Sequence, residues 1–379
     1  MSNGVSFSVP ENGRLIMIAD CHGDYVLFKR LLKNLAICED DVLAFLGDFS
    51  NKGAGSYACV NELMLLDKSR KNTIVLAGNG EYSNIRIFLS GDQDKILNYC
   101  KKWPKNNLYR DWAAQCGFSE ITQDNFDRVH QSILASFSEQ MQWLRDLPLY
   151  AVSDEFVLVH AAMPEIPSDG MATIGNLVSD DFIYTGENRT GRWQIIGHMP
   201  VNNMQGQIVP CVDAQRKIIN IDGGVNTVAF TQLNALIWSR KNGFELLFDD
   251  HDPTGIVLED YDPAPQTPLV HRWADRWITV LERGKSFSLC ETRTGRVGMV
   301  KNEFIRADAK GDLIFAGASY AALIQVRKGE RVKIMDESAD DHVFVKNTQG
   351  YLGYVPREIV RPEPDAADRQ FAFVRKLKI

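Results

Sequence analysis

The sequence predicts an α/β domain built on a buried sheet, followed by a smaller all-β region. Short apolar runs recur through the N-terminal two thirds of the chain, and segments with apolar residues at helical spacing lie between them. The C-terminal third alternates apolar and polar residues over short distances, which is typical of strands. A run of acidic residues and prolines after Leu247 marks the change. We place the domains at residues 1–248, 249–308 and 309–379.

The stretch from Leu15 to Gly53 predicts a strand, a helix and a second strand. Apolar runs at residues 15–19 and 42–46 each end at an aspartate, and the segment between them repeats leucine and phenylalanine at helical spacing. Such a unit places Asp20, His22 and Asp48 at the carboxyl ends of neighbouring strands, where open α/β sheets bind ligands.

Two carboxylates and an imidazole are donors that favour Mn, Fe or Zn. The alternative is that two strands end in ordinary turn aspartates, because aspartate is common in turns. The same placement recurs further along the chain: after apolar runs at residues 73–77, 156–159, 193–196 and 218–221 come Asn79, His160, His198 and Asp222, respectively. A Gly-Asn-Gly turn would account for Asn79 alone, but turn chemistry does not explain the whole series.

Composition narrows the class of protein. A net charge of −7 argues against a general nucleic-acid or anionic-membrane surface. Seven cysteines, an odd number without a C-x-x-C pair, favour reduced thiols and a cytoplasmic location. The N-terminus lacks a signal-peptide pattern, and no apolar run is long enough to span a membrane.

Six sequence blocks in order resemble the calcineurin-like metallophosphoesterases, closest to the phosphoprotein-phosphatase branch of bacterial type, which also contains diadenosine tetraphosphatases. The resemblance covers roughly residues 14–240 and implies a β-sandwich flanked by helices. The blocks are ADCHGD at 19–24, GDFSNKG at 47–53, GNGE at 78–81, HAA at 160–162, GHMP at 197–200 and IDGG at 221–224.

The resemblance implies a centre of two divalent metal ions, with Mn²⁺ as the first expectation and Fe or Zn as alternatives. One ion would take Asp20, His22 and Asp48, and the other would take Asp48, Asn79, His160 and His198. Two such ions bind a phosphate and lower the pKa of a water. The implied activity is hydrolysis of a phosphate ester or anhydride, on a protein or a small molecule.

Several positions depart from the family pattern. Gly80 stands where the family has a histidine near the leaving group, and Asn51 stands where an aspartate steadies that histidine. The catalytic acid is therefore unassigned. Lys52 replaces a phosphate-binding arginine and keeps its charge without the bidentate fork. Arg189 is our candidate for a second phosphate-binding residue, with Arg192 next; the alternative for Arg189 is a solvated loop residue.

Three hypotheses address the missing acid. The enzyme acts without it on a good leaving group, since a general acid contributes about 10²–10⁴-fold. Alternatively Cys21, Glu81 or Tyr82 donates the proton. In the third hypothesis the domain is a pseudophosphatase scaffold that binds metal and a phosphorylated partner without turnover. We favour retained hydrolysis, because every implied metal ligand is present.

The C-terminal region contains an internal repeat. Residues 295–305 match residues 350–360, and the copies resemble tandem Src-homology-3-like barrels. Such barrels bind proline-rich ligands with aromatic grooves. Here the groove tryptophan positions hold Ser286/Phe287 and His342/Val343 instead. We therefore expect packing, self-association or docking of a protein partner.

Overall fold

The computed structural model describes residues 3–179, 182, 185–205, 207–264, 269, 275–315, 323–363 and 373–376. The chain forms two compact units. The first comprises residues 1–199, 210–249 and 374–379, and the second comprises residues 200–209 and 250–373. The sequence-based limits at 248 and 308 stay predictions.

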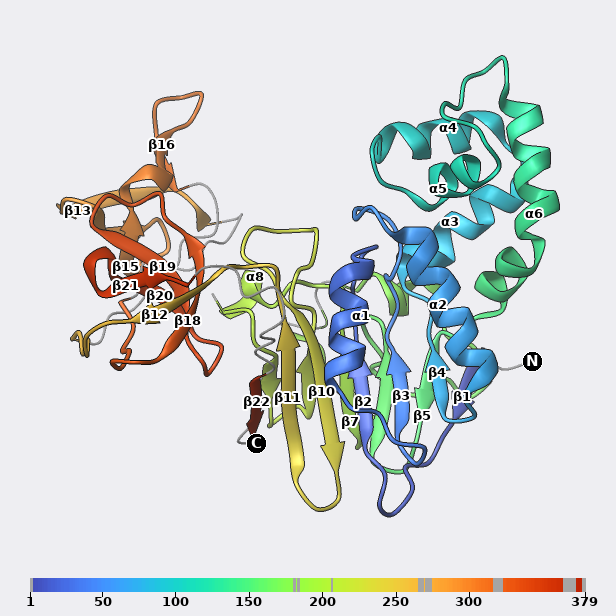
Figure 1. Cartoon of the computed structure of the whole chain (residues 1–379), viewed down its shortest axis with the longest axis horizontal. Helices are drawn as coiled ribbons and strands as arrows, with labels where there is room; N and C mark the ends of the chain where they lie inside the picture. Colours follow the sequence, from blue (N-terminus) through green and yellow to red (C-terminus); the bar gives the residue numbers. More distant parts are fainter. Residues whose placement is uncertain are drawn as a thin grey trace. The chain divides into compact units, whose positions relative to one another are not determined.

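The first unit contains two six-stranded sheets (Figure 1). The first sheet has the order β1 (Gly4–Ser6), β5 (Tyr150–Val152), β6 (Phe156–Val159), β7 (Trp193–Ile196), β9 (Ile218–Asn220) and β8 (Cys211–Asp213). The second has the order β22 (Phe373–Lys376), β11 (Gly243–Asp249), β10 (Leu233–Ser239), β2 (Leu15–Ile18), β3 (Val42–Phe45) and β4 (Thr73–Val75). The strands expected from apolar runs are confirmed to within two residues.

The core of this unit lies between the two sheets. Alternate residues of each strand point inward, so that Met17 and Ala44 of one sheet join Leu158 and Ile195 of the other in one buried cluster. All four side chains are fully buried. Burial on both faces explains why these strands read as continuous apolar runs.

Helices cover the second sheet and extend beyond it (Figure 1). The helix α1 (Tyr25–Asn34) packs on β10 and β11, and its Phe28 ring meets Phe45 of β3 edge to face at 5.7 Å. The other described helices of this unit are α2 (Ser56–Ser69), α3 (Asn79–Ser90), α4 (Gln93–Lys102), α5 (Leu108–Gln115), α6 (Phe126–Asp146) and the single 3-10 turn η1 (Ile174–Leu177). Phe88 of α3 contacts the rings of Tyr99 and Trp112, which joins α3, α4 and α5.

The second unit is mainly β-structure. One antiparallel sheet has the order β20 (Leu352–Pro356), β19 (His342–Lys346), β18 (Arg331–Asp336), β12 (Thr254–Val257) and β21 (Val360–Pro362). Smaller sheets contain β13 (Ile278–Arg283), β14 (Phe287–Thr292) and β15 (Val297–Lys301), and β16 (Ile305–Ala307) with β17 (Leu313–Phe315). The short helices are η3 (Asn302–Phe304), η4 (Arg357–Ile359) and α8 (Asn202–Gln205).

The two copies of the repeat fold alike. Each forms a strand, a single 3-10 turn and a second strand: β15, η3 and β16 in one copy, β20, η4 and β21 in the other. Strand β12 lies in the segment that we assigned from the sequence to the linker and first barrel, yet it pairs with β18 and β21. The Src-homology-3-like assignment stays a prediction.

Two further observations concern the whole described chain. None of the helices in the described residues has the length and apolar character that crossing a membrane requires. All seven cysteines are free thiols.

Candidate metal centre

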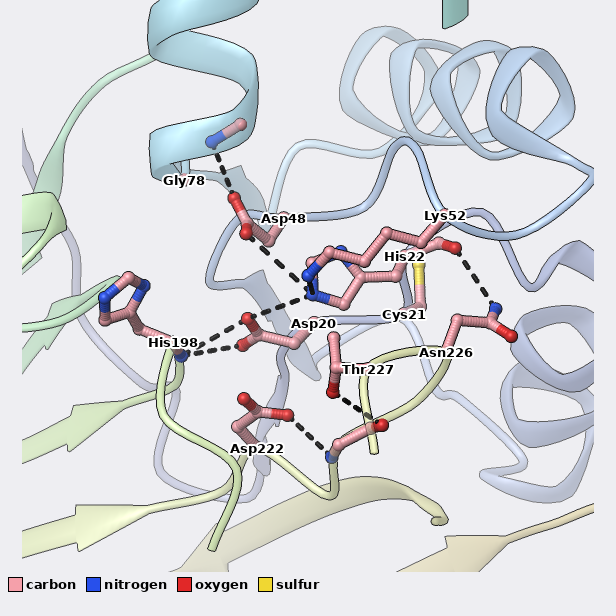
Figure 2. Close-up of polar contacts among 12 residues, drawn as sticks. Asp20, Cys21, His22, Asp48, Lys52, Gly78, His198, Asp222, Asn226 and Thr227 are labelled. Atoms are coloured by element: carbon pink, nitrogen blue, oxygen red, sulfur yellow. Dashed lines mark hydrogen bonds and ion pairs between the residues drawn. The ribbon is translucent and has the colours of Figure 1, made fainter. Parts of the chain in front are cut away.

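Six polar residues from both sheets converge at one edge of the sandwich. Each lies just after the carboxyl end of a strand: Asp20 and His22 after β2, Asp48 after β3, Asn79 after β4, His160 after β6 and His198 after β7. Figure 2 shows Asp20, His22, Asp48 and His198 gathered around one space. Ligand atoms of Asp20, Asp48 and His160 all lie within 4.8 Å of one another, and these residues are buried.

Asp48 lies between two histidines. Its Oδ2 is 3.9 Å from His22 Nε2, and its Oδ1 is 3.7 Å from His160 Nε2. The Gly80 N–H donates to Oδ1 at 2.8 Å. One carboxylate therefore offers a different oxygen to each side, which suits a bridging ligand.

His160 presents a lone pair to the centre. Its Nδ1 donates to the Leu46 carbonyl at 2.8 Å, which leaves Nε2 unprotonated. This Nε2 lies 3.0 Å from Asn79 Oδ1, so two acceptor atoms face each other. A cation between or beside them would remove the repulsion, and His22 Nδ1 has no partner among the described residues. The donor set fits divalent metal ions.

Electrostatics agree with metal binding. Burial lowers the pKa of His22 to about 3 and that of His160 to about 4, so both imidazoles are neutral, as metal ligands must be. Burial, together with the charges of Asp222 and Asp48, raises the pKa of Asp20 well above its usual value. A cation would offset this crowding of buried carboxylates.

The turns that aim the ligands have strained backbones. Asp20, His22, Asp48 and His198 have φ angles of 52°, 42°, 50° and 71°, a left-handed conformation that costs on the order of 1–3 kcal/mol each. The packing of Gly197 is equally restrictive, because a Cβ there would lie 2.1 Å from Asp20 Oδ2. The chain accepts this strain at the site where it places functional groups.

Glu81 orders the loop that carries Asp48. Its Oε2 accepts from the backbone N–H groups of Asp48 at 2.8 Å and Gly78 at 3.1 Å. Its Oε1 accepts from Ser50 N at 3.2 Å and Ser50 Oγ at 2.7 Å. Burial and the charge of Asp48 raise the pKa of Glu81 to about 7. Sequence reasoning considered Glu81 only as a proton donor and missed this supporting role.

The departures from the family pattern also have definite places. Lys52 Nζ lies 2.9 Å from His22 Nε2, so its charge reaches the centre. Asn51 accepts at Oδ1 from the Tyr99 hydroxyl and from Leu108 N at 3.1 Å, and its Nδ2 donates to Ser50 Oγ at 3.4 Å. Gly80 contributes only its backbone N–H, to Asp48.

Arg189 has surface contacts. Its guanidinium lies 3.4 Å from Glu165 and 3.7 Å from Glu187, and its side chain is 54% exposed. Arg192 donates from Nε to the Ser153 carbonyl. Among the described residues, the side-chain contacts of these two arginines do not include a residue of the centre.

Two residues near the centre complete the arrangement. Asp222 Oδ1 accepts from Gly224 N at 2.7 Å, while its buried Oδ2 has no partner in the described part of the chain. Burial raises the pKa of Asp222 to about 7. Asn226 donates to the His22 carbonyl at 3.2 Å and helps to hold that loop (Figure 2). Sequence reasoning did not identify Asn226, which follows no apolar run directly.

A family model of calcineurin-like phosphoesterases matches residues 13–202, and the chain belongs to this family. The family uses divalent metal ions.

Solved structures provide distant likenesses. The chain is similar to a protein provisionally assigned as a diadenosine tetraphosphatase (15% identity, 66% of this chain and 100% of that chain, TM-score 0.45). It is also similar to a protein serine/threonine phosphatase from Saccharomyces cerevisiae (14% identity, 62% of this chain and 76% of that chain, TM-score 0.35). A third likeness is to a metallophosphoesterase from Sphaerobacter thermophilus (14% identity, 62% of this chain and 86% of that chain, TM-score 0.34). No curated protein sequence matches the chain significantly.

Proposed function

We propose that the first unit is a dinuclear metal-dependent phosphoesterase that hydrolyses a phosphate ester or anhydride. The convergence of two carboxylates, three imidazoles and one amide at one edge of the sandwich supports this proposal most strongly. One ion is assigned to Asp20, His22 and Asp48. The other is assigned to Asp48, Asn79, His160 and His198.

Bound ions of this kind hold phosphate oxygens and lower the pKa of a water. The residues of the chain have separate tasks. Asp48 faces both groups of ligands, and Glu81 fixes the Asp48 loop. Lys52 supplies a positive charge for a phosphate oxygen, as a point charge rather than a bidentate fork. We propose Mn²⁺ as the native ion, because oxygen and imidazole donors suit it.

The leaving group receives little help from this site. Gly80 has no side chain to donate a proton, and the amide oxygen of Asn51 already accepts hydrogen bonds from Tyr99 and Leu108. A general acid contributes about 10²–10⁴-fold, so its absence penalises alkyl phosphates more than aryl phosphates or phosphoanhydrides. The proposed substrates are therefore those with good leaving groups.

A substrate panel tests this selectivity. Metal-loaded protein is assayed with p-nitrophenyl phosphate, bis-p-nitrophenyl phosphate, a phosphoserine peptide and a dinucleoside polyphosphate. We expect turnover of the activated substrates and at least about 100-fold slower turnover of the phosphoserine peptide. Equally fast phosphoserine turnover would mean that another group donates the proton. Metal binding without any turnover would favour the pseudophosphatase scaffold.

The second unit is proposed to pack or to dock a partner rather than bind proline-rich peptides. Ser286 Oγ donates to Asp341, and the Phe287 ring lies 5.3 Å from that of His342 and 4.7 Å from that of Tyr354. Residues at the expected groove positions thus contact one another across β14, β19 and β20. Comparing the molecular mass of the full chain and of a Phe287→Ala variant in solution would test self-association.

A further inference from the structure

One basic and aromatic segment has no role in the proposed chemistry. Residues 101–107, here the Trp103 loop, comprise the last two residues of α4 and the connection to α5, and they begin Lys-Lys-Trp-Pro-Lys. Lys101, Lys102 and Lys105 are exposed, and Trp103 is half-buried. Three lysines and a tryptophan within five residues concentrate positive charge locally, on a chain whose net charge is −7.

This loop lies next to the metal centre. Lys52 Nζ is 2.9 Å from His22 Nε2 and 5.9 Å from the centre of the Trp103 ring. Lys102 Nζ lies 5.4 Å from the same ring. Lys52 thus connects the indole to the ligand cluster, and a molecule whose phosphate contacts Lys52 has the ring within reach.

The loop is held in place by the turn that carries the family departures. Lys52 N donates to the Asn106 carbonyl at 3.2 Å, and Asn106 Nδ2 donates to the Lys52 carbonyl at 2.9 Å. Asn107 Nδ2 donates to the Trp103 carbonyl at 2.7 Å. Asn51 Oδ1 accepts from the first residue of α5. Asn51 therefore anchors the residue that directly follows the Trp103 loop.

A flat ring with several ammonium groups suits a ligand that combines an aromatic base with multiple phosphates. We propose that the Trp103 loop binds the base of a nucleoside polyphosphate and the phosphates next to it, and that this class is the substrate of the metal centre. The inference rests on the proposed function and deepens it. A phosphoanhydride also matches the absence of a side chain at Gly80, because its leaving group departs as a stable anion.

The reaction is hydrolysis and needs no further reactant. The oxygen of a water forms a bond to the phosphorus held at the centre, and the bridging P–O bond breaks. The electron pair of that bond goes to the leaving phosphate of the nucleotide. The water releases its proton to solvent. The Trp103 loop contacts the leaving nucleotide and acts through binding.

The test compares ATP with inorganic tripolyphosphate, which has the same anhydride but no base. In metal-loaded full-length protein, we expect Trp103→Ala to lower the ratio of kcat/KM for ATP to that for tripolyphosphate about 10- to 100-fold. Trp103→Phe retains a stacking face and should stay within about threefold of the wild type. The triple variant Lys101→Ala/Lys102→Ala/Lys105→Ala should lower both kcat/KM values about tenfold at low salt and leave their ratio unchanged. Lys241→Ala, an exposed lysine on the β10–β11 turn, is the matched control.

The outcomes separate the two proposals. Titration calorimetry of metal-free protein gives the ratio of Kd values for ATP and tripolyphosphate, which requires no turnover. An unchanged ratio in Trp103→Ala, by kinetics and by calorimetry, overturns the nucleotide site whether or not the protein hydrolyses phosphates. A changed Kd ratio without turnover of any substrate supports the site and refutes the hydrolase. Loss of phosphoserine-peptide binding in both loop variants, with the ATP ratio intact, would assign the loop to a peptide instead.

Discussion

Replacing Glu81 with glutamine separates a supporting role from an acid role. The Glu81 carboxylate accepts four hydrogen bonds, from three backbone N–H groups and the Ser50 hydroxyl. An amide NH₂ cannot accept, so Glu81→Gln leaves at least one of the three backbone N–H groups without an acceptor in a buried site. That loss costs about 1–3 kcal/mol, and exchanging a charged acceptor for a neutral one adds about 1 kcal/mol. We expect a total of about 2–4 kcal/mol.

Thermal unfolding and metal titration measure the effect. For a unit of this size, about 2–4 kcal/mol corresponds to a decrease in Tm of roughly 5–15 °C. Affinity for Mn²⁺ should fall about tenfold or more, because the Asp48 loop loses its anchor. Glu11→Gln, at an exposed position, should change neither quantity. If Glu81→Gln instead kept Tm and metal affinity but removed the alkaline limb of the pH–rate profile, Glu81 would be the proton donor and our reasoning would be wrong.

Three other substitutions probe separate parts of the structure. Lys52→Met removes the ammonium group that lies beside His22 Nε2. In calorimetric titrations, Mn²⁺ binding should become about tenfold tighter, and binding of inorganic phosphate should become weaker by a similar factor. A decrease in both affinities would contradict this prediction. Asn51→Ala leaves a backbone N–H of α5 without its acceptor and should lower the free energy of unfolding in urea by about 2 kcal/mol; a loss below 0.5 kcal/mol would show that the contact is dispensable. In the second unit, burial acts to raise the pKa of Asp250, but the charges of Lys346 and Lys333 lower this pKa overall. The paired carboxylate therefore stabilises the fold at pH values above its unfolded pKa of about 3.9, and this stability is lost as the pH falls. Lys346→Met should cost about 3–5 kcal/mol at pH 7 and move acid unfolding to higher pH; an unchanged acid midpoint would refute the pairing.

Local pattern was enough to predict the strands and the residues at their ends. The runs at residues 156–159 and 193–196 became β6 and β7 with the same limits. Buried parallel strands must be apolar on both faces, and their polar residues are pushed to the ends. The structure accordingly brings the predicted residues at those ends together.

Contacts between distant segments were beyond that reasoning. The hydrogen bond from Leu108 N to Asn51 Oδ1 joins residues that are 57 positions apart, and no local spacing in the sequence indicates it. Glu81 was visible in the sequence, but its task depends on how the turns after β3 and β4 approach each other. Arg189 was assigned from a family position; its side chain contacts the surface residues Glu165 and Glu187, and its role in phosphate binding stays a prediction.

The most direct test of the central claim is phosphate-ester hydrolysis by Mn²⁺-loaded protein, with the bound metal counted in the same sample. The proposal predicts two ions per chain and turnover of p-nitrophenyl phosphate. In Asp48→Asn, which removes the carboxylate shared by both groups of ligands, metal content and turnover should fall together, by at least about 100-fold in rate. Asp154→Asn, at an exposed position, should retain both. Two bound ions without turnover of any phosphate substrate, or turnover that survives in Asp48→Asn, would contradict the assignment.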